Sequence, residues 1–182
     1  DLMAVRLPEF GYQTQFVCLK HGKFAAARLS QSTPLVTVPM GSRFDLRPVR
    51  AVARLVREGG VCLVHTHTPR SALIGGLAAR LAGVSLVHHI QSPTSRDSML
   101  AGRNRINALV ERISLWKVAG VIPVSNTMKD YAHEYHMTGR HLAVVPNGVP
   151  ARDGLADRPS PRDSWTIGTV ALFRPRKGLD LL

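Results

Sequence analysis

The stretch VCLVHTHTPRSALIGGLAARLAGVSLVHHIQSP, residues 61–93, holds two apolar runs with a segment of helix length between them. The runs, residues 61–67 and 85–91, are rich in Val, Leu and Ile and have the length of strands. The segment between them is apolar with many small residues, so we expect a helix that packs closely on a sheet. A strand, a helix and a second strand in this order predict a βαβ unit with parallel strands.

The same alternation continues on both sides of this stretch. Further runs of strand length are residues 12–19, 34–39, 120–125, 141–146 and 166–172. A helix predicted over residues 47–58 has an apolar face of Val49, Val52, Ala53 and Val56 and a basic stripe of Arg47, Arg50, Arg54 and Arg57. A helix predicted over residues 103–117 has an apolar face of Ile106, Leu109, Val110, Ile113 and Trp116, by which we expect it to pack on the sheet.

This pattern sets the fold class and the domain organisation that we expect. Apolar strands alternating with helices predict an α/β fold with a doubly wound parallel sheet. Residues 150–164, PARDGLADRPSPRDS, lack periodicity and are typical of a linker. We therefore predict a first domain over residues 1–149 whose first strand is missing, a linker over 150–164, and the truncated start of a second domain over 165–182.

The net charge of +12 is the strongest signal in the composition. A charge of this size favours anionic partners such as nucleotides, phosphorylated sugars, acidic lipid head groups or nucleic acid. The chain has no zinc-finger spacing, no aromatic-rich RNA platform and no long Lys/Arg block, so we expect no specific nucleic-acid partner.

The chain has features of a protein of the cytoplasm. No apolar run reaches the length of a membrane span, and no leader of basic and then apolar residues follows Asp1. Cys18 and Cys62 lie in apolar runs, so we expect buried, reduced thiols. Basic residues on or beside the helix at 103–117 leave peripheral contact with an anionic inner membrane face as an open alternative: Arg96, Arg103, Arg105, Arg112 and Lys117.

Polar side chains follow the two strands of the opening stretch. His65 and His67 alternate along the first strand, so both side chains point to the same side. Three interpretations stay open for them: histidines hydrogen-bonded to backbone, part of a substrate cleft with Thr68 and Arg70, or metal ligands. The spacing identifies no third ligand, so we expect no metal.

The second strand ends in HHIQSPTS, residues 88–95, and should face the same crevice as the first. A neutral histidine here has the chemistry of a general base, whereas Gln91 can only exchange hydrogen bonds. Near the end of the chain, Arg174 and Lys177 lie between a predicted strand and a predicted helix. Cations at that place are suited to clamping a diphosphate.

In order along the chain, VHTHTPRSALIG, VHHIQSPTSRDS, VIPVSNTMKDY, VVPNGV and GTVALFRPRKG resemble the motifs of the family 4 glycosyltransferases. That family has the GT-B fold, with two facing Rossmann-like domains. The resemblance implies that residues 1–149 are the Rossmann-like acceptor-side domain and that residues 165–182 begin the domain that binds a nucleotide-sugar. It also implies transfer of a glycosyl unit to a sugar, lipid-linked or other polar acceptor, with retention and without a metal or other cofactor.

The resemblance assigns roles to particular residues of this chain. It places Lys177 and Arg174 at the donor diphosphate. On the acceptor side it places the following residues: His65, His67, Thr68, Arg70 and Ser92. Relatives carry an H-(V/I)-H-S-P pattern whose second histidine faces the reacting sugar, and that position is Gln91 here, with His89 at the first histidine.

The glutamine leaves two functions open. Either the parent protein is a glycosyltransferase that uses His89 and Gln91, or it is a non-catalytic binding module of the same fold that has lost its base. For the 182-residue chain alone we expect no activity in either case.

Overall fold

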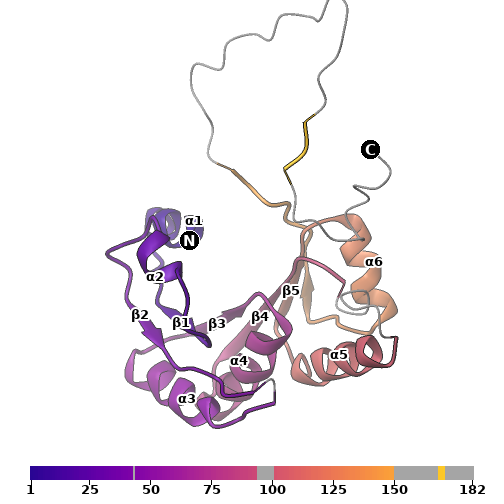
Figure 1. Cartoon of the computed structure of the whole chain (residues 1–182), viewed down its shortest axis with the longest axis horizontal. Coiled ribbons are helices and arrows are strands. Elements are labelled where there is room, and N and C mark those ends of the chain that lie inside the picture. The colour runs from indigo at the N-terminus through magenta and orange to yellow at the C-terminus, as the bar shows by residue number, and fades with distance from the viewer. Residues whose placement is uncertain (43, 94–100, 150–167, 171–182) are drawn as a thin grey trace, which may run out of the picture. The chain divides into compact units, whose positions relative to one another are not determined.

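The computed structural model describes residues 1–42, 44–93, 101–149 and 168–170 (Figure 1). The chain divides into two compact units, Asp1–Asn147 and Gly148–Leu182. The helices and strands below all belong to the first unit. The predicted linker and the basic loop with Arg174 and Lys177 lie outside the described residues, as does the strand predicted over 166–172 apart from residues 168–170.

The strands of the first unit form two parallel sheets. The larger sheet has the order β3-β4-β5-β6, with strands Leu63–Thr66, Ser85–Ile90, Gly120–Pro123 and His141–Leu142. The smaller sheet pairs β1, Phe16–Cys18, with β2, Leu35–Thr37. The parallel α/β fold predicted from the sequence is confirmed. Each strand is shorter than its apolar run, because the ends of the runs continue as loops.

Helices connect the strands. The four longer ones are α3 (Pro48–Glu58), α4 (Pro69–Ala82), α5 (Ala101–Ser114) and α6 (Asn126–Glu134). Short helical turns lie near the N-terminus: α1 (Leu2–Arg6), the 3₁₀ turn η1 (Leu7–Phe10) and α2 (Phe24–Ala27). Helix α4 lies between α3 and α5 and covers β3 and β4 (Figure 1).

The face predicted for α3 is the face that the structure buries. Val49, Val52, Ala53 and Val56 are buried together with Ile74 and Ala78 of α4. Burial of a valine side chain contributes about 1.5 kcal/mol or more, so this face fixes α3 on the unit. The arginine stripe of α3 is exposed to solvent, as the amphipathic pattern predicted.

Two adjacent glycines let α4 approach its neighbours closely. A Cβ atom added to Gly75 would lie 2.6 Å from Thr66 Cγ2 on β3. A Cβ atom added to Gly76 would lie 2.6 Å from the carbonyl oxygen of Ser114 at the end of α5. The close packing predicted for this small-residue segment is therefore confirmed, and it requires glycine.

The packing face predicted for α5 is wrong. Four of the expected core residues are exposed, three on α5 and one just after it: Ile106, Leu109, Ile113 and Trp116. The face turned inward carries Asn107, Ala108, Glu111 and Ser114. Small side chains are needed on the side where α4 comes close to α5. On the same side the Glu111 carboxylate has a buried partner on β4. The polar face of α5, and not its apolar face, therefore packs against the sheet.

Two further expectations concern cysteines and membrane spans. Cys18 is half-buried and Cys62 is exposed, and both are free thiols, so the prediction of two buried thiols is wrong for Cys62. That residue lies in the loop just before β3, where no element covers it from solvent. Among the described residues, no helix combines the length and apolar character needed to cross a bilayer.

Candidate functional site

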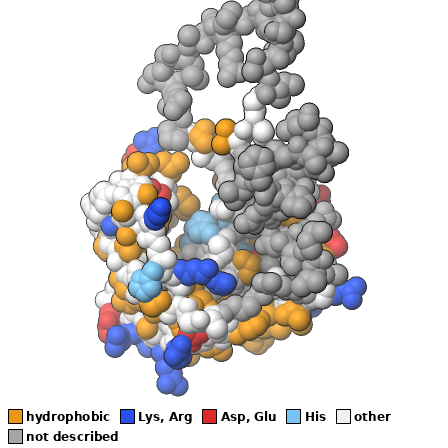
Figure 2. Space-filling model, in the orientation of Figure 1, with side chains coloured by type: hydrophobic (Ala, Val, Ile, Leu, Met, Phe, Trp, Pro, Cys, Tyr) orange, Lys and Arg blue, Asp and Glu red, His pale blue; other side chains and the backbone are white. Residues whose placement is uncertain are grey.

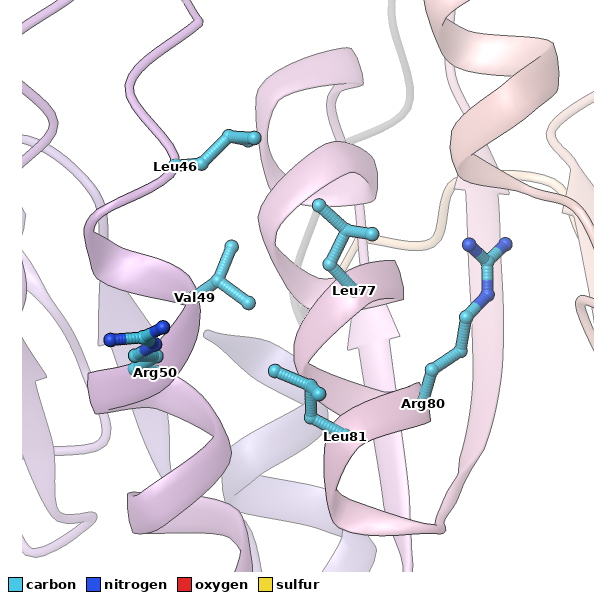
Figure 3. Close-up of a pocket in the computed structure, with 6 residues that line it drawn as sticks. All are labelled: Leu46, Val49, Arg50, Leu77, Arg80 and Leu81. Carbon is cyan, nitrogen blue, oxygen red and sulfur yellow. The ribbon is translucent and has the colours of Figure 1, made fainter.

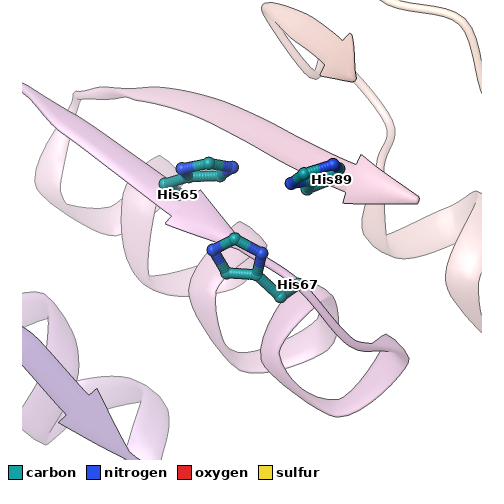
Figure 4. A group of neighbouring side chains, drawn as sticks. All are labelled: His65, His67 and His89. Carbon is teal, nitrogen blue, oxygen red and sulfur yellow. The ribbon is translucent and has the colours of Figure 1, made fainter. Parts of the chain in front are cut away.

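Three histidines meet at the carboxyl ends of β3 and β4 (Figure 4). His65 lies on β3, His67 is the first residue after that strand, and His89 lies on β4, which pairs with β3 in parallel register. The ring centroids of His65 and His67 are 4.3 Å apart, and that of His89 is 6.0 Å and 5.4 Å from them. The predicted convergence of the two strand ends on one side of the sheet is confirmed for these three side chains.

The three imidazoles are neutral at neutral pH. Burial lowers the pKa of His65 to about 4, and the adjacent rings of His67, His89 and His88 lower it in the same direction. The pKa of His67 is also lowered to about 4, because the neighbouring side chains partly desolvate its ring although the residue as a whole is exposed, and His89 and His88 lower it further. The pKa of His89 is lowered by burial and by His88. A neutral imidazole has a free lone pair, which can accept a proton or coordinate a metal.

Two nitrogen atoms of this group are buried without a hydrogen bond from any described residue. They are Nε2 of His65 and Nε2 of His89. Buried polar atoms nearly always have a partner, so such atoms mark a place where a ligand can supply one. One side-chain nitrogen from each of the three histidines lies within 4.8 Å of the others, which makes them the residues suited to hold a metal ion.

The residues after β3 form the N-terminal cap of helix α4. Thr68 is the N-cap of α4, and its hydroxyl accepts a hydrogen bond from the Ser71 backbone N–H at 3.2 Å. In return the Ser71 hydroxyl accepts from the backbone N–H groups of Thr68 at 2.8 Å and His67 at 3.1 Å. Such a capping box satisfies the first N–H groups of a helix, so the Thr68 hydroxyl serves α4 first.

The other predicted site residues are not brought into the histidine group. Arg70 is half-buried and lines a small pocket between α4 and α5. Gln91 and Ser92 follow β4 as exposed residues of the loop, two and three positions beyond His89. Arg174 and Lys177 lie outside the described residues.

A buried polar chain behind the site was not predicted from the sequence. The Thr66 hydroxyl lies 2.8 Å from Nδ1 of His88, and Nε2 of His88 lies 3.3 Å from Oε1 of Glu111. All three side chains are buried. Adjacent residues of a strand point to opposite faces, so His88 turns toward α5 while His89 turns toward the site. This alternation is visible in the sequence, and it was the available signal that His88 and His89 have different roles.

A groove on the surface of the first unit lies away from the histidines (Figure 3). It has a volume of about 430 Å³ and is lined by residues on or just before α3 and α4: Leu46, Val49, Arg50, Leu77, Arg80 and Leu81. None of the three histidines lines it. Histidine side chains are visible near the middle of the face drawn in Figure 2, with basic side chains toward its lower edge.

Comparison with known proteins shows which families and proteins this chain resembles. The family model "Glycosyltransferase Family 4" matches residues 2–153. The chain is 25% identical over 109 residues to UDP-Gal:alpha-D-GlcNAc-diphosphoundecaprenol alpha-1,3-galactosyltransferase from Escherichia coli. That match covers 58% of this chain and 28% of the relative.

Solved structures show the same fold. HepE from Anabaena, crystallised in complex with UDP, is similar with a TM-score of 0.65 and 18% identity. Its complex with UDP and glucose is similar with a TM-score of 0.59 and 17% identity. Each match covers 81% of this chain and 40% of HepE, so the chain spans less than half the length of these relatives. The α/β fold of the GT-B type is thereby confirmed, and with a family match over residues 2–153 the chain belongs to glycosyltransferase family 4.

Proposed function

We propose that this chain is the acceptor-side part of a glycosyltransferase that moves a glycosyl unit from a nucleotide-sugar to an acceptor with retention. The observation that carries the proposal is the group of His65, His67 and His89 at the strand ends of a family 4 domain. In parallel α/β sheets, ligands bind outside the carboxyl ends of the strands. The names of the E. coli relative and of the HepE complexes, which contain UDP, support a uridine nucleotide as part of the donor.

His89 is the side chain best placed to act on the acceptor. It comes from the strand end, its imidazole is neutral, and its Nε2 atom has no hydrogen bond from a described residue. Such a group can accept the proton that an acceptor hydroxyl loses when the new glycosidic bond forms. Gln91, two positions on, has the chemistry to hold a sugar hydroxyl but not to take its proton.

The remaining roles follow the resemblance. Lys177 and Arg174 are proposed to neutralise the diphosphate that leaves as the donor bond breaks, a task suited to fixed cations. His65, His67, Thr68, Arg70 and Ser92 are proposed to line the acceptor side. The transfer step itself is proposed to need no metal or other cofactor.

The acceptor is proposed to be lipid-linked and reached at the inner face of a membrane from the cytoplasm. The name of the E. coli relative includes a diphosphoundecaprenol acceptor. The exposed apolar side chains of α5 support this, since Arg105, Arg112 and Lys117 on or beside the same helix are also exposed. Apolar residues flanked by cations are typical of helices that lie on anionic lipid.

The test is an assay of a protein that joins residues 1–182 to a complete donor domain, with UDP-sugars and lipid-linked or free sugar acceptors. We expect transfer with retention, read from the anomeric configuration of the product. His89→Ala should lower the rate by about 100-fold or more, the usual contribution of an acid–base group. His133→Ala, on the exposed side of α6, is the matched control and should leave the rate unchanged.

A non-catalytic binding module is the second candidate, and Gln91 is the observation that favours it. Absence of transfer in the joined protein, with sugar binding retained, would support this candidate. Gln91→His then decides the role of the position, because restored transfer identifies a lost base, whereas an unaltered rate shows that Gln91 is no defect. Robust transfer by the 182-residue chain alone would contradict the proposal that it is inactive without its donor domain.

A further inference from the structure

The three histidines form a group that the proposed transfer reaction does not fully explain. A single base would serve an acceptor hydroxyl, yet three imidazoles gather here from β3, from the residue just after it and from β4 (Figure 4). His67 follows β3 directly and its ring lies beside that of His65, and the pairing of β3 with β4 brings His89 beside them. His65 and His89 are held by the hydrogen-bonded register of the sheet, and His67 is the first residue after β3.

The free nitrogen atoms of the group need a partner. Nε2 of His65 and Nε2 of His89 are buried, and no described residue bonds to them. A buried polar atom without a partner costs free energy that a bound ligand recovers. The neutral state of the rings means that a cation can bind without first displacing protons near pH 7.

We propose that His65, His67 and His89 form a three-histidine site for a divalent transition-metal ion, with Zn²⁺ as the ion that fits best. Imidazole ligands suit zinc, copper and nickel, whereas magnesium and calcium take oxygen ligands. Three protein ligands leave the fourth position of a tetrahedral zinc ion open to water or to a ligand.

To bind zinc, the three imidazoles have to move slightly closer together. Zinc–nitrogen bonds of about 2.0–2.1 Å in a tetrahedron place the ligand atoms about 3.3 Å apart. The three nitrogen atoms now lie within 4.8 Å of one another, so side-chain rotations have to bring them together. His67 is exposed and therefore has room for such a rotation.

The consequence for activity rests on the proposed function. A zinc ion on these rings would occupy the lone pair of His89 and the acceptor side that His65 and His67 line. Micromolar zinc would then inhibit transfer, and a chelator would restore it. Binding of the ion itself does not depend on that function.

The test is calorimetric titration of the whole chain with ZnCl₂ at pH 7.5, in a Cys62→Ser background because Cys62 is an exposed free thiol. We expect one zinc ion per chain, and we expect His67→Ala to weaken binding at least tenfold. The matched control is His133→Ala, which removes an exposed histidine of α6 and should leave the affinity unchanged. Mg²⁺ should give no heat of binding.

A second measurement keeps the inference falsifiable if a variant is poorly folded. Cobalt(II) added to the parent chain should produce the intense visible absorption of a tetrahedral site, and zinc should abolish it. Zinc affinity that His67→Ala leaves unchanged, or that His133→Ala weakens equally, would overturn the site. Sugar transfer by a joined protein that shows no zinc site would overturn this inference and leave the proposed function standing.

Discussion

Nε2 of His88 lies 3.3 Å from Oε1 of Glu111, and both side chains are almost completely buried, with exposed fractions of 1% and 3%. The contact joins β4 to α5, directly behind the strand position that presents His89 to the site. The Thr66 hydroxyl holds the other ring nitrogen of His88 at 2.8 Å. Helix α5 is thereby fixed to the sheet by a polar contact, and its apolar side is left facing solvent.

Removal of the Glu111 carboxylate should destabilise the protein strongly. Breaking a buried charged or polar pair leaves the other partner unsatisfied and typically costs about 3 kcal/mol. We expect Glu111→Ala to lower the free energy of unfolding by about that amount in urea titrations. Glu111→Gln keeps a hydrogen-bonding oxygen and should cost less. Glu134→Ala, at an exposed acidic residue of α6, is the control and should change the stability by less than about 0.5 kcal/mol.

Gly76 is predicted to be intolerant of a side chain. An added Cβ would lie 2.6 Å from the Ser114 carbonyl, a backbone atom that cannot turn aside. We expect Gly76→Ala to destabilise the protein by about 2 kcal/mol, as overpacked positions do. Gly102→Ala on α5 is the matched control, since a Cβ there meets nothing within 4 Å, and it should be neutral or stabilise by up to about 1 kcal/mol. Equal effects of the two changes in thermal unfolding would contradict a close approach of α4 to α5.

The histidine group predicts how stability depends on pH. Burial of His65 and partial desolvation of the His67 ring lower the pKa of each from the ordinary 6.5 to about 4, so the unfolded chain takes up these protons first as the pH falls. The contribution of these two neutral histidines to the free energy of unfolding is therefore fully present above pH 6.5. It is lost progressively as the pH falls from 6.5 to 4. The measurement is the urea midpoint across this range with a chelator present. His65→Gln should flatten the dependence, whereas a slope unchanged by this variant would show that other groups cause it.

The fold was predictable because its signals are local. Apolar runs and helical periods are visible in the sequence, and they located the strands of both sheets and the buried face of α3. The packing of α5 was not predictable in this way. Its apolar stripe has the same helical spacing as that of α3, but the partner of Glu111 lies 23 residues away on β4, and only the assembled sheet brings them together.

Part of the candidate site was also predictable from the sequence. Alternation along one strand placed His65 and His67 on one side, since that relation needs no tertiary information. The arrival of His89 as a third member depends on which strands pair and in which register, and a single sequence does not encode that directly. The sequence also did not show that Thr68 is committed to the cap of α4, because a cap and a ligand site use the same residue types.

The exposed apolar side of α5 leads to the last prediction, a test of membrane contact. Ile113 and Trp116 are 59% and 64% exposed, and Lys117 lies 4.9 Å from the Trp116 ring centroid. Insertion of such side chains into the lipid interface is favourable, and each nearby cation adds about 1 kcal/mol on anionic lipid. We expect the chain to float with phosphatidylglycerol vesicles but not with phosphatidylcholine vesicles, and added salt should weaken the binding.

The matched variants decide whether α5 makes this contact. Ile113→Ser with Trp116→Ser should reduce vesicle binding about tenfold or more, because two apolar groups no longer enter the interface. Phe10→Ser with Leu29→Ser removes equally exposed apolar side chains from the N-terminal part of the chain and should leave binding unchanged. Binding that survives in the α5 variant, or that is lost equally in the control, would show that charge alone or another surface holds the lipid. Loss of binding in the α5 variant alone would identify the exposed apolar side of α5 as the surface that contacts the membrane.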